Sequence, residues 1–230
     1  MNVLEEVKAT PIEEVVERIK TMAKRKKLPI VFAGKVKDLL FINFVLKLKE
    51  YLKPENTLIA DDTVIITPEI FGLQIFWELP KRVEKLKDAF LCIPSYSTPE
   101  HKRALKKIVN ICKKSKPSLC VISYMFYDVN SAESIVKKLM DSTDFLVLHM
   151  IPALYSTAVY KSPAIQVITS YSGVLAKEFN LSKEHRTFLL KNRLETEKTY
   201  GLVIIDGEII PVYSKLPKKV TSEGAVEEIL

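Results

Sequence analysis

Short apolar segments that alternate with amphipathic ones are the feature that most restricts how this chain can fold. Strands are expected at residues 28–33, 57–62, 89–93, 118–124 and 145–150, and several of them are continuous apolar runs. After an N-terminal helix, further helices are expected between these strands, at residues 39–52, 98–114 and 131–140. Strands that are apolar on both faces are typical of a parallel sheet covered by helices on both sides.

The last third of the chain has a different pattern. We expect a strand at residues 165–168, a short helix near 174–179 and a strand at 185–191. Two further strands flank Asp206-Gly207, and an Asp-Gly pair between apolar segments is a strong signal for a tight β-hairpin. The sequence therefore predicts an α/β fold: a mostly parallel sheet with helices on both faces and a C-terminal antiparallel hairpin. A short strand at 63–67 and a helix that begins near Pro68 complete the expected elements.

Length and composition set the remaining limits. The chain has 230 residues, of which 47% are hydrophobic, so it can fill the core of one large domain. We divide it into an N-terminal helix (1–26), an α/β core (27–214) and a loose C-terminal tail (215–230). Its 3 cysteines lack metal-ligand spacing, and the N-terminus does not resemble a signal peptide. Since no apolar run approaches the ~18 residues of a membrane helix, we expect a cytoplasmic protein without membrane contact.

A strand, a glycine turn and a helix follow one another around Gly34-Lys35. This is the layout of a phosphate-binding loop, G-x-x-x-x-G-K-[ST], in which backbone amides surround phosphate and the hydroxyl holds magnesium. Counted from Gly34, the last three motif positions hold Leu39, Leu40 and Phe41. Counted with Gly34-Lys35 as the terminal pair, the first glycine and the hydroxyl are replaced by Pro29 and Val36. Because both registers fail, we expect this degenerate loop to bind no cofactor.

Six segments between residues 27 and 213 support a family resemblance. They are the Gly34-Lys35 turn, the strand 89–93, the strand 118–124, Asp144 to Leu148, Arg186 to Arg193 and the hairpin 205–212. In this order they resemble the Walker A loop, the Walker B strand, the sensor strand, two later strands and the closing hairpin of the RecA-like core of the RadA and KaiC families. The resemblance implies a three-layer fold of the P-loop NTPase type. The chain is also similar to an uncharacterised archaeal family of degenerate RecA-like proteins. Its thermophile-like composition is consistent with that similarity.

Departures from the family pattern concern the ATP chemistry. The expected Walker B strand ends at Ile93-Pro94-Ser95, without the carboxylate that holds magnesium. No glutamate follows the second strand to polarise water, unless Asp61 or Asp62 takes that role. All three parts of the chemistry are absent together, so we expect no catalytic residues and no ATPase activity.

The expected function is therefore that of a non-catalytic binding or assembly module. Its partner would be a protein or peptide segment, a second copy of the chain or an ATPase paralogue, since RecA-like families commonly assemble by docking an extended segment beside the core. Tyr155, Tyr160 and Tyr171 lie in a segment, 152–172, that carries Lys161 as its only charge. Such a segment suits an interface and would equally serve as a cover over one sheet edge.

A nucleic-acid-binding accessory protein of recombination or repair is the alternative function. The chain has a formal charge of +7, and the helix 99–114 is followed by Lys116 in a stretch, 101–116, that contains no acid. The candidate contact residues are Lys102, Arg103, Lys106, Lys107, Lys113 and Lys114. Such a ridge could contact phosphates without reading sequence, or it is only a solvated face.

Other polar residues give no clear site. Asp61-Asp62 could bind a metal, but adjacent acids at a strand end more often form a turn. The three histidines, His101, His149 and His185, lie far apart in sequence. We expect no metal site, and no residue pattern supports a small-molecule enzyme of another kind.

Overall fold

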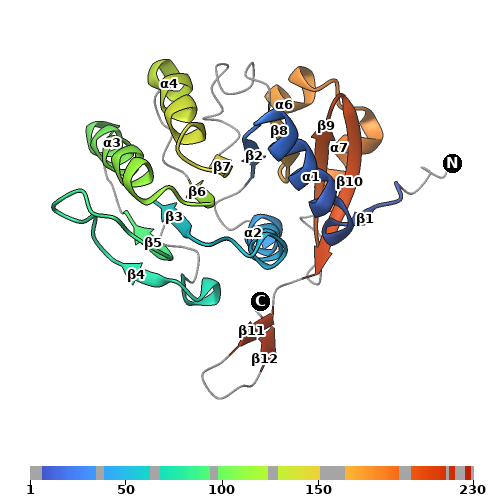
Figure 1. The fold of residues 1–230 in the computed structure, drawn as a ribbon. Helices are drawn as coiled ribbons and strands as arrows, with labels where there is room; N and C mark the ends of the chain where they lie inside the picture. Colours follow the sequence, from blue (N-terminus) through green and yellow to red (C-terminus); the bar gives the residue numbers. More distant parts are fainter. Residues whose placement is uncertain are drawn as a thin grey trace, which may run out of the picture.

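Ten strands form one continuous sheet within the part of the chain that the structure describes (Figure 1). The computed structural model describes residues 7–34, 39–62, 68–93, 98–123, 129–150, 164–191, 198–215, 218–220 and 226–228. The strand order is β1-β10-β9-β8-β2-β7-β6-β3-β5-β4. Lys35, the expected strand 63–67 and the candidate interface residues Tyr155 and Tyr160 lie outside the described residues.

The elements follow the predicted alternation of strands and helices. The strands of the sheet are β1 (Thr10–Pro11), β2 (Ile30–Ala33), β3 (Thr57–Asp61), β4 (Gln74–Phe76), β5 (Ala89–Cys92), β6 (Leu119–Ser123), β7 (Phe145–Met150), β8 (Ile165–Ile168), β9 (Lys198–Ile205) and β10 (Glu208–Lys215). The helices are α1 (Ile12–Lys26), α2 (Leu39–Leu52), α3 (Thr98–Ser115), α4 (Val129–Met140), α6 (Gly173–Glu178) and α7 (Lys183–Leu190), with a 3-10 helix, η1, at Pro68–Phe71.

The strands from β8 to β4 in this order all run parallel. Every residue of β2, β5, β6 and β7 is buried, as expected for strands covered on both faces. Two hydrophobic clusters fill the two faces. One contains the apolar sides of α1 and α2, and the other contains those of α3, α4, α6 and α7. The predicted fold class, with helices on both faces of a mostly parallel sheet, is confirmed.

The antiparallel part of the sheet begins at β9, which pairs with β8 and with β10. Ile205 pairs with Glu208, so the hairpin loop is Asp206-Gly207, with φ angles of 51° and 82°. Positive φ at both central residues is the geometry that favours Asp-Gly in two-residue hairpins. The predicted hairpin is therefore confirmed.

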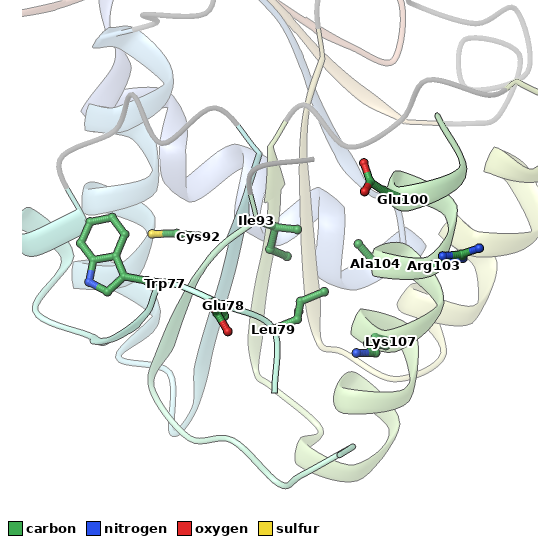
Figure 2. Close-up of a pocket in the computed structure, with 9 residues that line it drawn as sticks. All are labelled: Trp77, Glu78, Leu79, Cys92, Ile93, Glu100, Arg103, Ala104 and Lys107. Atoms are coloured by element: carbon green, nitrogen blue, oxygen red, sulfur yellow. The ribbon is translucent and has the colours of Figure 1, made fainter. Parts of the chain in front are cut away.

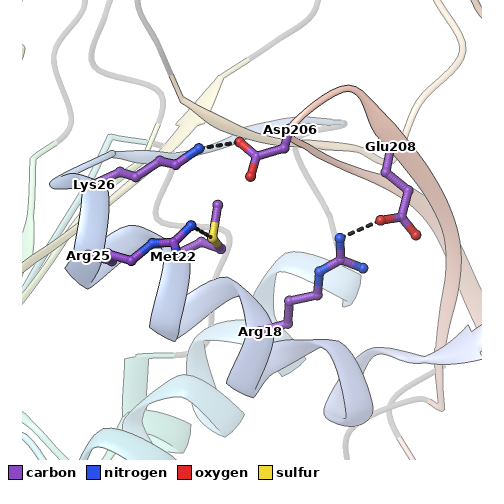
Figure 3. Close-up of polar contacts among 6 residues, drawn as sticks. All are labelled: Arg18, Met22, Arg25, Lys26, Asp206 and Glu208. Carbon is purple, nitrogen blue, oxygen red and sulfur yellow. Dashed lines mark hydrogen bonds and ion pairs between the residues drawn. The ribbon is translucent and has the colours of Figure 1, made fainter.

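Helix α1 is linked to this hairpin by two ion pairs (Figure 3). Arg18 bonds to Glu208, and Lys26 Nζ lies 2.5 Å from Asp206 Oδ1. The hydrogen bond from Arg18 lowers the pKa of the Glu208 carboxyl. Both pairs are exposed to solvent, so we expect them to contribute little to stability.

Helix α2 approaches the sheet closely at Gly201 of β9. A Cβ atom added to Gly201 would lie 2.5 Å from Leu40 Cδ2 and 3.1 Å from the Ile168 carbonyl oxygen. At the first distance the Leu40 side chain would have to shift, and Leu40 is 1% exposed in the packed core. Glycine at this position therefore allows the N-terminal turn of α2 to pack directly on the sheet.

Three predictions about local structure need correction or addition. Residues 185–191 were expected to form a strand but lie largely in α7, whose N-terminus is capped by Ser182 Oγ accepting from the His185 N–H at 3.2 Å. Only one turn of 3-10 helix follows Pro68. The tail expected to be loose contains two short antiparallel strands, β11 (Lys218–Val220) and β12 (Val226–Glu228).

No helix among the described residues is long and apolar enough to cross a membrane.

Candidate functional site

Gly34 directly follows β2 at the carboxyl end of the parallel strands, where a phosphate-binding loop would begin. The Gly34 N–H donates to the Met150 carbonyl oxygen of the neighbouring strand β7, at 3.0 Å. This donor already has a partner inside the protein. The backbone at Gly34 thus continues the sheet ladder rather than presenting its amide to a ligand.

Phe41 occupies the first turn of α2 beside this position. Its ring is 1% exposed and stacks on the imidazole of His149 in β7, with centroids 4.1 Å apart and an interplanar angle of 21°. The Phe32 ring of β2 meets it edge-on at 5.2 Å. In the register counted from Gly34, Phe41 stands at the hydroxyl position of the phosphate-loop motif. The structure therefore has an aromatic cluster at a place where a nucleotide-binding loop has polar groups.

A row of buried polar residues crosses the carboxyl ends of three neighbouring strands. Asp61 of β3 is in register with Ser123 of β6, which is in register with His149 of β7. All three are at most 1% exposed, and Ser123 Oγ lies 3.4 Å from His149 Nδ1. The Asp62 N–H donates to the Ser123 carbonyl oxygen at 3.3 Å.

Sequence reasoning treated the members of this row separately. His149 lies far in sequence from the other two histidines, and Asp61-Asp62 has the pattern of a turn. The signal that could have revealed this row is that β3, β6 and β7 each carry a polar residue near the carboxyl end. Because neighbouring parallel strands end at the same edge of the sheet, these residues lie side by side. Within the described ranges, no group of three or more His, Cys, Asp or Glu residues is arranged to hold a metal ion.

The strand order changes the expected Walker B assignment. Strand β5 is separated from β2 by β7, β6 and β3, so at about 4.8 Å per strand it lies about 19 Å away. A carboxylate after Ile93 would be too far from Gly34 to share a magnesium ion with phosphate there. Strand β6, two spacings or about 10 Å from β2, is the better counterpart, and it ends at Ser123.

A pocket of about 330 Å³ lies directly after β4, between residues 77–79, the end of β5 and helix α3 (Figure 2). Its apolar lining includes Leu79, Ile93 and Ala104, and the exposed indole of Trp77 stands at one side. Its charged lining consists of Glu78, Glu100, Arg103 and Lys107. Cys92 also lines it, and burial, followed by the nearby Asp61 and Glu69 charges, raises the pKa of its thiol.

The predicted basic ridge of α3 divides between two surfaces. Lys102, Lys106 and Lys113 line a groove of about 470 Å³ between α3 and α4. Arg103 and Lys107 instead line the pocket beside β4. Lys114 Nζ donates to the Val83 carbonyl oxygen at 2.6 Å. The structure thus brings only half of the six candidate residues to one groove, where Lys138 of α4 joins them.

Tyr171, the one candidate interface residue that the structure describes, follows β8 and is 41% exposed. Val174 of α6, three residues later, is 63% exposed. Two exposed apolar side chains do not by themselves define an interface. The role of the segment 152–172 stays a prediction.

The described fold resembles solved structures of a viral enzyme. The genome-packaging NTPase of Sulfolobus turreted icosahedral virus 2 in complex with ATP-gammaS matches with a TM-score of 0.55 and 12% identity, over 81% of this chain and 97% of that chain. The same NTPase in complex with sulfate matches with a TM-score of 0.55 and 14% identity, over 82% and 96%. No protein-family model and no curated protein matches the chain. At this identity the likeness establishes the fold alone: the chain shares the α/β fold of this NTPase.

Proposed function

We propose that this chain is a non-hydrolysing binding module: a degenerate RecA-like core that docks an extended segment of a protein partner. The observation that carries the proposal is the packing of Phe41 against His149 and Phe32. A buried aromatic ring at the position of the motif's hydroxyl supplies no magnesium ligand. The bond from the Gly34 N–H to Met150 supports the same conclusion.

The carboxylates on the described strand ends support the loss of hydrolysis as well. Strand β6, the counterpart of a magnesium-binding strand, ends at Ser123. Asp61 is the last residue of β3 and Asp62 follows it, and β3 lies three strand spacings, about 14 Å, from β2. Asp61 is wholly buried, so its oxygens are poorly placed to polarise a water molecule beside a nucleotide.

The two edges of the sheet differ in their capacity to accept another strand. At one edge, β1 has two residues, and Pro11 has no N–H to donate. At the other, β4 pairs with β5 and, among the residues that the structure describes, with no second strand; the Gln74 N–H donates to the Asp88 carbonyl oxygen at 2.8 Å. Since successive residues of a strand direct their backbone groups to opposite sides, Ile75 directs its N–H to the open side. The β4 edge is therefore the one suited to strand addition.

The pocket beside β4 supports the same partner class. In strand addition, main-chain hydrogen bonds provide affinity and side-chain pockets provide specificity. The apolar lining of Leu79, Ile93 and Ala104, with Trp77 58% exposed at its side, fits one apolar or aromatic side chain of the docked segment.

The proposal places the module in the cytoplasm. All three cysteines are free and buried, which fits a reducing compartment. Cys112 Sγ and Cys120 Sγ lie 3.7 Å apart, and this hydrogen bond, together with burial, raises the pKa of the Cys120 thiol well above its ordinary value. Such thiols are poor nucleophiles, since the thiolate is the reactive form.

Trp77, the single tryptophan, makes the docking proposal directly testable. Peptides selected from a displayed random library on the wild-type chain should shift its fluorescence to shorter wavelength as the indole leaves water. Ile75→Pro, which removes the outward N–H, and Trp77→Ala should each weaken binding of a labelled peptide by about tenfold or more, which corresponds to about 1.4 kcal/mol. Tyr51→Ala, at an exposed aromatic residue of α2, is the matched control. Peptides that bind all three variants as tightly as the wild type would contradict the proposal.

A further inference from the structure

The groove between α3 and α4 is positively charged, and the proposed docking of a protein segment at β4 does not involve it. Its lining consists of Lys102, Lys106, Val109, Asn110 and Lys113 from α3 and Ser134, Ile135 and Lys138 from α4. The four lysines are exposed, and none of these described lining residues is an acid. Glu133 of α4 is exposed next to Ser134 but does not line the groove. Two helices thus present positive charge to one groove.

We propose that this groove binds the phosphate backbone of double-stranded nucleic acid. Lys102 and Lys106 are four residues apart, and Lys113 follows after seven more, so all three project from one side of the helix. At 1.5 Å per residue the row is about 16 Å long. Phosphates of one strand of a duplex recur about every 3.4 Å along its axis, so the row spans the axial rise of about five of them.

The residue types that line the groove favour a duplex over a single strand. Proteins that bind single strands combine a basic groove with aromatic side chains on which bases stack, and no aromatic residue is among the described residues that line this groove. Lysine ammonium groups act as point charges without the planar fork that reads guanine. Binding is therefore to the backbone of a duplex, independent of its base sequence and steeply dependent on salt.

Fluorescence anisotropy with a labelled duplex of mixed sequence tests the proposal on the full chain. If the four lysines neutralise four phosphates, log Kd changes with log salt with a slope of about 3.6, so affinity falls about 150-fold between about 50 and 200 mM salt. The triple variant Lys102→Glu, Lys106→Glu, Lys113→Glu should lose most of this binding and most of this slope. A matched triple variant, Lys24→Glu, Lys177→Glu, Lys183→Glu, makes the same change in net charge at exposed lysines of α1, α6 and α7. It should retain binding to within about fivefold.

Several results would overturn the proposal. Equal loss in the two triple variants would mean that overall charge, rather than this groove, attracts the duplex. Tighter binding of a single strand than of the duplex would refute the choice of ligand, as would vesicles of phosphatidylserine binding as tightly as the duplex. Replacement of the same three lysines by glutamine, with the circular dichroism melt as a check of folding, separates loss of contact from loss of structure. Retained binding in that folded variant would also overturn the proposal.

Discussion

Removing the Phe41 ring should be among the most damaging single substitutions in this chain. Phe41 is 1% exposed and contacts both Phe32 and His149. Truncation of a buried phenylalanine to alanine costs about 3–5 kcal/mol, since it removes burial and leaves a cavity. In a domain of this size each kcal/mol lowers the melting temperature by about 2–4 °C, so Phe41→Ala should lower it by about 6–20 °C.

Urea unfolding followed by circular dichroism measures this loss, with an unchanged slope as evidence that the folded state is intact. Tyr51→Ala is the matched control, because Tyr51 lies on the same helix and is 44% exposed. A double-mutant cycle of Phe41→Ala with His149→Ala should give a coupling of about 0.5–1.5 kcal/mol from the ring stack. If Phe41→Ala destabilises the protein no more than Tyr51→Ala does, the Phe41 ring is not packed against Phe32 and His149. Phe41 would then not exclude a ligand at Gly34.

Three further predictions concern other parts of the molecule. Gly201→Ala should destabilise the protein by about 1–3 kcal/mol, because the new Cβ would meet Leu40 Cδ2; an unchanged melting temperature would disprove the close approach. The hydrogen bond from Arg18 lowers the pKa of Glu208, so the pair stabilises the fold above the unfolded-state pKa of about 4.3 and this contribution disappears as the pH falls through the folded-state pKa. An NMR titration should show the low Glu208 pKa and its return towards normal in Arg18→Gln, whereas a pKa unaffected by that substitution would rule out the pairing. Finally, a thiol reagent at pH 8 should label neither Cys112 nor Cys120 until the chain unfolds, since both are wholly buried; rapid labelling of either residue in the native protein would show that these thiols are accessible.

Much of the fold could be predicted because local and long-range signals agree. The continuous apolar runs predicted buried parallel strands, and Asp206-Gly207 predicted the hairpin, since few other residues accept two consecutive positive φ angles. The error at residues 185–191 has a physical reason. The buried pair Phe188-Leu189 fits a short strand as well as one face of a helix, and the decisive cap from Ser182 lies outside the apolar segment.

The candidate sites were less predictable because they depend on strand order. Nothing local in Ala89–Cys92 shows that β3, β6 and β7 separate it from β2. The row of Asp61, Ser123 and His149 likewise exists only because three strands that are distant in sequence are neighbours in the sheet. The helical spacing of Lys102, Lys106 and Lys113 could be read from the sequence, whereas the contribution of Lys138 required the packing of α4 on α3.

Isothermal titration of the chain with ATP and Mg²⁺ tests the central claim most directly. If the turn at Gly34 has become a packing element, the titration should show no saturable heat at nucleotide concentrations up to about 1 mM, a limit that corresponds to a binding free energy weaker than about −4.1 kcal/mol. Saturable one-site binding with a Kd of about 1 μM, or about −8.2 kcal/mol, would contradict it. Such a result would mean that the loop still holds phosphate despite the ring of Phe41.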